Sequence, residues 1–400
     1  MKKPAVATDT ATPAGFPREL LDAPRAERIA YFRAYTVGHP ALNYAVSELT
    51  AALDGAGDTD LVIIYGPPGA GKTTLLEIIM RMVIDEMLPS MGDDKGLVPI
   101  VGFPAVGRGA KESFVWSDCW RRALLAIDDP LVTDKRFPRV PLRLAQGRLP
   151  AVVPTKMEAN SALLMAWEQA LRERRPRAVL IDEAQDMFAG LSFGSLQKQL
   201  NCLKGQADRT GVLHVLSGTY DLLAVTELSA QLTRRSINIH LPRYLLERPR
   251  DVVAFRKTLE QFQLHLPLAE MPDLLGQWEF LYERSIGCVG VLKQWLTRAL
   301  ARALRKQAPT LDRKMHLEAS AFSRAAILNM LIEAREAEAA LARRELAADD
   351  QLEALLRTPL PLMKPKGNAP RQAPAESAKT GKPFERAPGR DPVGTAGHGE

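Results

Sequence analysis

The hydrophobic positions of this chain follow two different patterns along its length. In the first two thirds, short runs of consecutive apolar residues alternate with segments in which apolar residues recur every three or four positions. Uninterrupted apolar runs are typical of strands buried on both faces, and the wider spacing is typical of amphipathic helices. The expected strands cover residues 61–65, 97–103, 177–182 and 211–217. This alternation predicts an α/β domain with a parallel sheet flanked by helices.

The alternation ends after a last β-type segment at residues 231–241. From Pro249 to about Arg357 the spacing is helical throughout, and residues 322–357 predict one long or kinked helix. The tail that follows is rich in Pro, Lys and Gly and has few large apolar residues, which predicts disorder. We therefore expect a flexible N-terminus at 1–18, an α/β domain at 19–246, a helical region at 247–358 and a disordered basic tail at 359–400.

Composition narrows the class of protein only slightly. Of 400 residues, 46% are hydrophobic and 25% are charged, which is typical of a soluble globular protein. No apolar run approaches the roughly 18 residues that would span a bilayer, and the first residues lack the apolar core of a signal peptide. The three cysteines are far apart and fit neither a zinc spacing nor a disulfide framework, which favours a reducing cytosol. A net charge of +6 is compatible with nucleic acid but does not indicate it.

The strongest chemical motif lies at residues 66–73, which we call the phosphate loop. Its sequence is Gly66, Pro67, Pro68, Gly69, Ala70, Gly71, Lys72, Thr73. This matches the pattern G-x-x-x-x-G-K-[ST], with an apolar run before it and a helical pattern after it. Glycines let backbone N–H groups turn inward around phosphate oxygens, and the positive end of the helix dipole points at the same place. The motif, together with Thr74, predicts a nucleotide-phosphate site.

A second motif indicates that the nucleotide is hydrolysed. Asp182 and Glu183 follow a buried apolar run about 110 residues after Lys72. Acidic residues at the carboxyl end of a central parallel strand lie where ligands bind in open α/β sheets. We expect Asp182 and the Thr73 hydroxyl to hold Mg²⁺, and Glu183 to act as the general base on the attacking water. The alternative is an ordinary acidic turn after a strand.

The order of these motifs resembles the layout of AAA+ ATPases. That resemblance implies ATP as the substrate, a helical lid at 247–358 and an α/β nucleotide-binding domain at 19–246. It also implies a polar sensor of the γ-phosphate at the end of the strand 211–217, for which we favour Thr219 over Ser217. The alternative for Thr219 is a hydroxyl that caps the following turn.

The same resemblance implies an arginine finger that reaches the nucleotide of a neighbouring subunit. Arg234 and Arg235 are the candidates, with Arg235 preferred, and the alternative is a solvated helix end. A guanidinium suits this role because its fork pairs with phosphate oxygens as charge develops. One position departs from the AAA+ pattern, because Gly290 stands where many members carry a lid arginine. A lid-borne phosphate sensor is therefore in doubt, and Lys293 is a weak substitute.

Weaker features are similar to the TniB/TnsC family of AAA+ transposition regulators. They are spread over residues 19–345 and comprise Arg25-Ala26-Glu27-Arg28-Ile29, His39-Pro40-Ala41, Ser217-Gly218-Thr219, the stretch 231–235 followed by Leu241-Pro242-Arg243-Tyr244, and Gly287-x-x-Gly290-x-Leu292. The resemblance implies a bacterial cytoplasmic protein that forms a homo-oligomer, ring or filament, on double-stranded DNA in the presence of ATP. It also implies partnership with a DDE transposase and with a target-selector protein, and no membrane partner.

The family also places the region after the second strand in the bore of the oligomer, facing DNA. Arg108 and Lys111 are the candidate phosphate contacts, because basic residues on a glycine-containing loop suit sequence-independent binding. The alternative is an ordinary solvated loop. Two other functions remain open: another bacterial AAA+ ATPase of the secretion-associated or helicase-loader type, and a STAND-like switch driven by nucleotide exchange.

Overall fold

The computed structural model describes residues 15–55, 59–106, 114–130, 132, 156–226 and 235–357. At its centre is a five-stranded, fully parallel sheet with the order β2-β3-β4-β1-β5. The strands are β1 (Leu61–Tyr65), β2 (Val101–Pro104), β3 (Ala178–Asp182), β4 (Leu213–Gly218) and β5 (Ser236–His240). The predicted fold class is confirmed: an α/β core with a parallel sheet flanked by helices, followed by a helical region.

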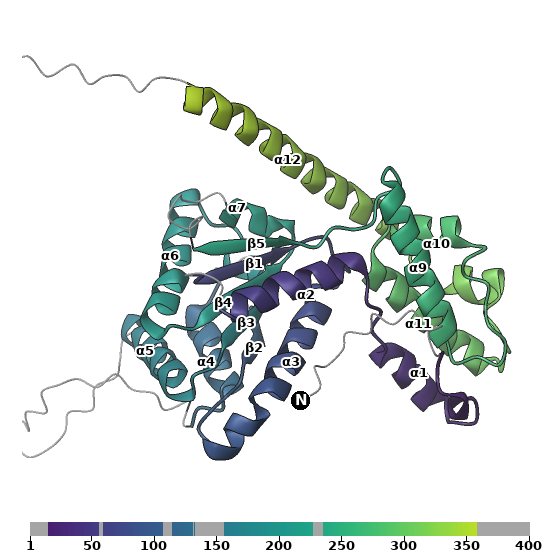
Figure 1. The fold of residues 1–400 in the computed structure, drawn as a ribbon, viewed down its shortest axis with the longest axis horizontal. Coiled ribbons are helices and arrows are strands. Elements are labelled where there is room, and N and C mark those ends of the chain that lie inside the picture. The colour runs from purple at the N-terminus through teal and green to yellow at the C-terminus, as the bar shows by residue number, and fades with distance from the viewer. Residues whose placement is uncertain are drawn as a thin grey trace, which may run out of the picture. The chain divides into compact units, whose positions relative to one another are not determined.

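Helices cover both faces of the sheet, which explains why its central strands are continuously apolar (Figure 1). Leu61 and Ile63 of β1 point into a core built with α4 (Trp116–Ala126), α5 (Lys156–Arg174) and α6 (Phe193–Thr210). Val62 and Ile64 point into a second core built with α2 (Pro40–Leu53) and α3 (Lys72–Asp93). Because successive side chains of a strand alternate between faces, a strand covered on both sides needs apolar residues at every position.

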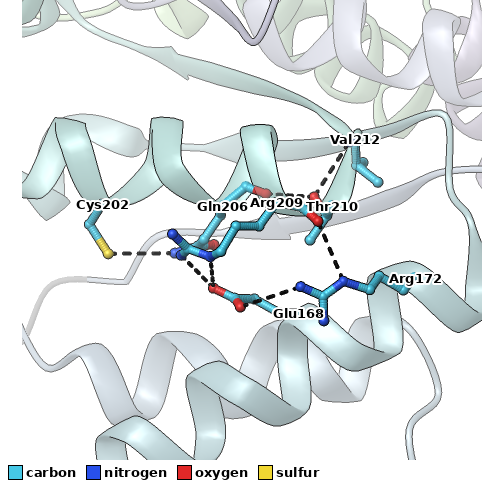
Figure 2. Close-up of polar contacts among 7 residues, drawn as sticks. All are labelled: Glu168, Arg172, Cys202, Gln206, Arg209, Thr210 and Val212. Carbon is cyan, nitrogen blue, oxygen red and sulfur yellow. Dashed lines mark hydrogen bonds and ion pairs between the residues drawn. The ribbon is translucent and has the colours of Figure 1, made fainter.

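Helices α5 and α6 are joined by a polar network around Glu168, whose side chain is largely buried (Figure 2). Both Nε and Nη2 of Arg209 donate to Glu168 Oε1, at 3.1 and 2.6 Å, and this hydrogen bonding raises the pKa of Arg209. Arg172 lies 3.9 Å from the other oxygen of the same carboxylate. A charge removed from water needs such partners, so the network explains why an acid is tolerated between two packed helices.

The second strand is shorter than the sequence predicted. Residues 97–100 were expected to be extended within the sheet, but β2 begins at Val101. The backbone N–H of Val98 donates to the carbonyl of Arg174 at the end of α5, and the carbonyl of Pro99 accepts from the N–H of Arg177, just before β3. These two residues are therefore held by the segment that connects α5 to β3. Proline lacks the N–H that a ladder needs, and this favours a start after Pro99.

A third core is formed by helices without strands. Its elements include α9 (Pro249–His265), α10 (Trp278–Ser285), α11 (Val289–Arg305) and the π-helical turn η5 (Arg313–Glu318). Helix α1 (Arg25–Ala34) belongs to this core as well: Phe32 is fully buried there against Phe262, and Arg28 donates to the carbonyl of Pro267. The chain therefore contributes an N-terminal helix to its C-terminal helical core, and the boundary expected at 246/247 stays a prediction.

The long helix α12 (Arg324–Arg357) ends the described part of the chain. The chain divides into two compact units, residues 1–344 and residues 345–400, and the boundary between them falls within α12. The remaining short helices are η1 (Arg18–Leu21), η3 (Ala184–Met187), η4 (Tyr220–Leu222) and α7 (Leu223–Thr226). No helix in the described ranges is long and apolar enough to cross a membrane.

Candidate functional site

The predicted site residues meet at the carboxyl edge of the sheet because of the strand order. The phosphate loop follows β1, Asp182 ends β3, and Thr219 follows β4, which lies between those two strands. Tyr65 pairs with Gly218 in the ladder, so the phosphate loop and Thr219 leave the sheet side by side. Segments more than 100 residues apart in the sequence thus share one edge, where ligands bind in open parallel sheets.

The phosphate loop turns directly into α3. Gly71 precedes the helix and has a φ of 104°, a backbone conformation that residues other than glycine rarely adopt. The Lys72 ammonium donates to the carbonyl oxygens of Gly66 and Pro67, at 2.9 and 3.0 Å, so its side chain folds back over the loop. Burial lowers the pKa of Lys72, and the carboxylates of Glu183 and Asp182 partly oppose that shift. This lysine is a half-buried cation near two carboxylates, and its positive charge is what a phosphate group requires of the site.

Thr73 and Asp182 are in direct contact. The Thr73 hydroxyl donates to Asp182 Oδ2 at 2.8 Å, across a separation of 109 residues in the sequence. Magnesium prefers hard oxygen ligands, commonly one carboxylate, a hydroxyl and the phosphates of its nucleotide. This donor pair, beside the amino end of α3 and the Lys72 cation, fits the Mg²⁺ ion that the motifs predict.

Glu183 occupies an unusual backbone conformation. Its φ is 53° and its ψ is 34°, in the left-handed region, and its N–H donates to Asp182 Oδ1 at 3.0 Å. A residue with a Cβ pays roughly 1–2 kcal/mol to adopt this conformation. The turn separates the two neighbouring carboxylates: Asp182 faces Thr73, and Glu183 is exposed in the adjacent cavity. Strain of this kind is often found at active sites.

A cavity of about 460 Å³ lies over the phosphate loop. Its walls combine loop residues with Glu183, Thr219 and residues of the C-terminal helices. The contributions from those helices are Gly290, Val291 and Gln294 of α11, with Phe322 and Met330 near the start of α12. The lining therefore combines polar groups from the phosphate loop and the strand ends with mostly apolar residues from the C-terminal helices.

Helix α11 rests directly on the phosphate loop. The backbone N–H of Gly290 donates to the carbonyl of Gly69 at 2.8 Å, and a Cβ at Gly290 would lie 2.7 Å from that same oxygen. Any side chain at this position would collide with the loop backbone. The structure thus gives a physical reason for the glycine that stands where many AAA+ proteins carry a lid arginine.

Helix α12 is fixed beside this cavity by a buried ion pair. Arg243 follows β5, is only 6% exposed, and binds both carboxylate oxygens of Glu338 at 2.9 Å each. It also donates to the carbonyl of Ile286. A bidentate arginine–carboxylate pair is among the strongest directed contacts available to a protein. Nothing in the sequence around Arg243 indicates this role, because its partner Glu338 lies 95 residues away.

At the end of β4, Thr219 lines the cavity, and the lining does not include Ser217. The Thr219 hydroxyl donates to Asp221 Oδ2 at 3.0 Å and accepts from the N–H of Asp221, so it caps η4. The alternative that the sequence left open, a capping hydroxyl, is therefore present in the structure. Ser217 is fully buried, and its hydroxyl has no hydrogen-bond partner among the described residues.

Arg235 lies at the opposite edge of the sheet, just before β5. Its guanidinium pairs with Asp60 at 2.9 Å and with Asp208 at 2.5 Å. In the ladder between β1 and β5, Leu61 pairs with Ser236. Arg235 therefore lies where these strands begin, a full strand length from the phosphate loop, which follows the end of β1. Arg234, Arg108 and Lys111 lie outside the described residues.

Comparison with known proteins identifies the core. Residues 56–225 match the family model of an AAA domain, and the sheet order and phosphate loop are those of the AAA+ P-loop NTPase fold. No curated protein sequence matches the chain.

Several solved structures resemble the fold at low identity. The ORC1 protein of Aeropyrum pernix in complex with DNA is 17% identical, with a TM-score of 0.48, over 75% of this chain and 69% of that one. The ADP form of the Aeropyrum pernix ORC2 protein is 18% identical, with a TM-score of 0.46, over 73% and 71%. Domain III of the Thermotoga maritima replication initiation protein DnaA is 15% identical, with a TM-score of 0.41, over 72% and 93%. Likenesses at this level carry no conclusion about activity or partners.

Proposed function

We propose that this protein, whose core is an AAA domain, is a Mg²⁺-dependent ATPase. The observation that carries the proposal is the contact between Thr73 and Asp182 at 2.8 Å, next to Lys72 and Glu183 in one cavity. Phosphoryl transfer to water needs little covalent chemistry from the protein, and depends on charge and positioning. Lys72, Thr73 and Glu183 line that cavity, and Asp182 adjoins it through its contact with Thr73. Together the four residues supply a cation, a pair of metal ligands and a base.

In the proposed reaction, backbone N–H groups of residues 69–74, which follow the two prolines of the phosphate loop, and the Lys72 ammonium hold the β- and γ-phosphates. Thr73 and Asp182 would hold Mg²⁺, which neutralises charge on the phosphates when it is bound. Glu183 accepts a proton from water as the water oxygen forms a bond to the γ-phosphorus. The bond between that phosphorus and the β–γ bridging oxygen breaks, and the products are ADP and inorganic phosphate.

The nucleotide would also be contacted from the helical side. Gln294, Phe322 and Met330 line the cavity beyond the phosphate loop. Their mixed apolar and amide character suits a base and a ribose better than a phosphate. We assign Thr219 as the group at the end of β4 that senses the γ-phosphate, with its hydroxyl exchanging Asp221 for the nucleotide or its water.

The candidates for the arginine finger are Arg234 and Arg235. In this proposal, the finger contacts the nucleotide bound by a neighbouring subunit. Arg235 cannot reach the nucleotide of its own chain from the opposite edge of the sheet. Its ion pairs with Asp60 and Asp208 would have to open for it to contact a neighbour. This competition favours Arg234 as the finger and Arg235 as the residue that anchors the start of β5.

At the level of biology, we propose a homo-oligomer on double-stranded DNA that regulates transposition by linking a target selector to a DDE transposase. The support is the TniB/TnsC resemblance of residues 25–29, 39–41, 217–219 and 287–292. Arg108 and Lys111 are the proposed DNA contacts. The alternatives, another bacterial AAA+ ATPase or a STAND-like switch, share the same site.

The first test is ATP turnover by the full-length chain with and without Mg²⁺, and with and without duplex DNA. Magnesium-dependent turnover that Lys72→Ala abolishes supports the ATPase proposal, and its absence in the wild type overturns it. Stimulation by duplex DNA and DNA-bound assemblies in electron microscopy with a non-hydrolysable ATP analogue support the transposition proposal. Turnover that is indifferent to DNA favours the other AAA+ classes, and slow exchange without turnover favours the switch.

A further inference from the structure

The side-chain amide of Gln185 joins the end of β3 to the end of β4. Its Nε2 donates to Glu183 Oε2 at 2.6 Å, and its Oε1 accepts from the backbone N–H of Thr219 at 3.1 Å. The two partners also fix which way the amide points, because the N–H of Thr219 can only donate and the carboxylate of Glu183 can only accept. The amide therefore presents a donor to Glu183.

The protein leaves space for this side chain. A Cβ at Gly218 would lie 2.3 Å from Gln185 Oε1 and 2.9 Å from Leu222 Cδ1. Real Cβ atoms do not make such approaches, so a side chain at position 218 would force the Gln185 amide and Leu222 to move. The glycine at the end of β4 thus leaves room for the Gln185 amide where the structure places it.

We propose that Gln185 is a positioning residue for Glu183, a role that rests on the proposed ATPase function. Glu183 is exposed and itself adopts the left-handed backbone conformation, so its carboxylate has few other constraints. The hydrogen bond from Gln185 occupies Oε2 and leaves Oε1 to accept the proton of the attacking water. Because the same amide is anchored to Thr219, a shift at the end of β4 moves the base.

This role predicts a loss of turnover without a loss of binding. Gln185 does not line the cavity, so its removal leaves the nucleotide contacts in place. A positioned general base accelerates its reaction roughly 10²–10⁴-fold, and a freely rotating Glu183 would lose part of that rate enhancement. We expect Gln185→Ala and the similarly shaped Gln185→Met to lower kcat about 10- to 100-fold, with nucleotide Kd within twofold of wild type. Gln185→Glu places a second carboxylate against Glu183 and is expected to be at least as impaired.

The deciding measurement is a double-mutant cycle with Glu183→Gln. If Gln185 acts through Glu183, adding Gln185→Ala to Glu183→Gln leaves the residual turnover unchanged. A merely structural role would lower both backgrounds by the same factor, together with the melting temperature. Gly218→Ala, which displaces the amide without removing it, is expected to reproduce the kcat loss of Gln185→Ala.

The matched control is Gln169→Ala. Gln169 donates to Glu173 at 2.6 Å on the surface of α5, which is the same distance as between Gln185 and Glu183. Neither Gln169 nor Glu173 lines the cavity, so Gln169→Ala is expected to leave kcat unchanged. The outcomes separate the two proposals. An active wild type silenced by Glu183→Gln but indifferent to Gln185→Ala and Gln185→Met overturns the positioning role alone. A wild type with no turnover overturns the ATPase proposal and the role that rests on it.

Discussion

The backbone N–H of Gly290, at the start of α11, donates a 2.8 Å hydrogen bond to the carbonyl oxygen of Gly69 in the phosphate loop. Val291 continues this contact, since its Cγ2 lies 2.7 Å from where a Cβ of Gly69 would be. At both Gly69 and Gly290 the loop and α11 meet with no room for a side chain, and Gly69 in addition adopts a φ of 76° that favours glycine. The nucleotide site is thus built jointly by the loop after β1 and by the C-terminal helices.

We predict that Gly290→Ala weakens nucleotide binding and stability together. The new Cβ would lie 2.7 Å from the Gly69 oxygen and 3.2 Å from its carbon atoms, all of them backbone, so the loop or α11 must shift. Overpacking of this kind costs about 1–3 kcal/mol, which corresponds to roughly a 5- to 150-fold loss when it acts on affinity. Titration with a fluorescent nucleotide and thermal denaturation measure the two effects. Gly290→Arg is expected to be worse, although it restores the arginine seen in many AAA+ lids.

Gly194→Ala provides the matched control. Gly194 lies in α6, and a Cβ there would meet nothing within 4 Å. Alanine is the better helix former, so this variant should keep its nucleotide affinity and gain up to about 1 kcal/mol in stability. Wild-type binding by both Gly290→Ala and Gly290→Arg would mean that α11 and the phosphate loop are separated in solution.

Lys72→Ala is predicted to abolish nucleotide binding and assembly. Lys72 is the half-buried cation of the candidate site, and alanine leaves the phosphates without their main point charge. Sedimentation with ATP and DNA would report assembly, and equilibrium dialysis would report binding. Assembly by a variant that binds no nucleotide would show that ATP does not license the oligomer.

Glu183→Gln should separate binding from turnover. The amide preserves shape but cannot accept the proton of water, so hydrolysis is expected to fall by at least about 10²-fold while ATP still binds. If hydrolysis drives disassembly, DNA-bound oligomers should persist longer than those of the wild type after dilution. An unchanged oligomer lifetime alongside collapsed turnover would exclude hydrolysis as the disassembly step.

The sequence indicates the residues at the centre of the candidate site because they carry a local pattern. An apolar run next to a glycine-rich loop or an acidic pair can be recognised without any partner. The structure brings Thr73 and Asp182 into contact, and their role as Mg²⁺ ligands stays a prediction. Strand boundaries were less predictable: Pro99 lies within an apolar run but cannot donate to a ladder, and β2 starts after it.

Contacts between distant segments were not predictable in the same way. Phe32 belongs to an amphipathic helix, and nothing in that pattern indicates that the helix packs against Phe262 rather than against the sheet. In the sequence, Gln185 is an ordinary polar residue in a turn. Only the fold shows that its side chain lies next to Thr219 and Gly218. Gly290 was interpreted as a missing arginine, whereas its backbone contact with Gly69 is what the position provides.

Stability is predicted to fall as the medium becomes acidic, partly because of His214. This side chain is 1% exposed, burial lowers its pKa to about 4, and its Nδ1 lies 2.9 Å from the carbonyl of Val212. Between pH 6.5 and 4 the unfolded chain binds a proton that the folded chain does not, so stability present above pH 6.5 is lost as pH falls. At pH 5 the loss of folding stability caused by His214 amounts to about 2 kcal/mol relative to pH 8.

His214→Asn tests this assignment. Asparagine keeps a donor near the Val212 carbonyl but does not titrate, so denaturant unfolding of the variant should depend less steeply on pH between 7 and 5. At pH 8 both chains are neutral at this position, and only a constant offset should separate them. Equal pH slopes for the two proteins would show that His214 does not contribute to acid sensitivity.

The two arginines before β5 are expected to behave differently. Arg235→Ala removes a partner from the largely buried carboxylate of Asp60 and from Asp208, so it should destabilise the fold by about 1–3 kcal/mol. Thermal denaturation of the monomer measures this cost directly. Arg235→Lys, which keeps the charge but loses the fork, should recover part of the loss. A melting temperature equal to that of the wild type would mean that these ion pairs contribute little to stability.

Subunit mixing determines which arginine, if either, is the finger. A finger variant should bind ATP as monomeric wild type does and lose about 10³-fold or more in turnover, the scale an arginine finger supplies. Lys72→Ala keeps a functional finger but lacks a usable pocket, whereas the finger variant keeps its pocket. Mixed assemblies should therefore regain turnover wherever the intact pocket meets the intact finger. We expect Arg234→Ala to be rescued in this way. If no mixture recovers activity although mixing is verified by differential labelling, these arginines act within their own subunit or only support the fold.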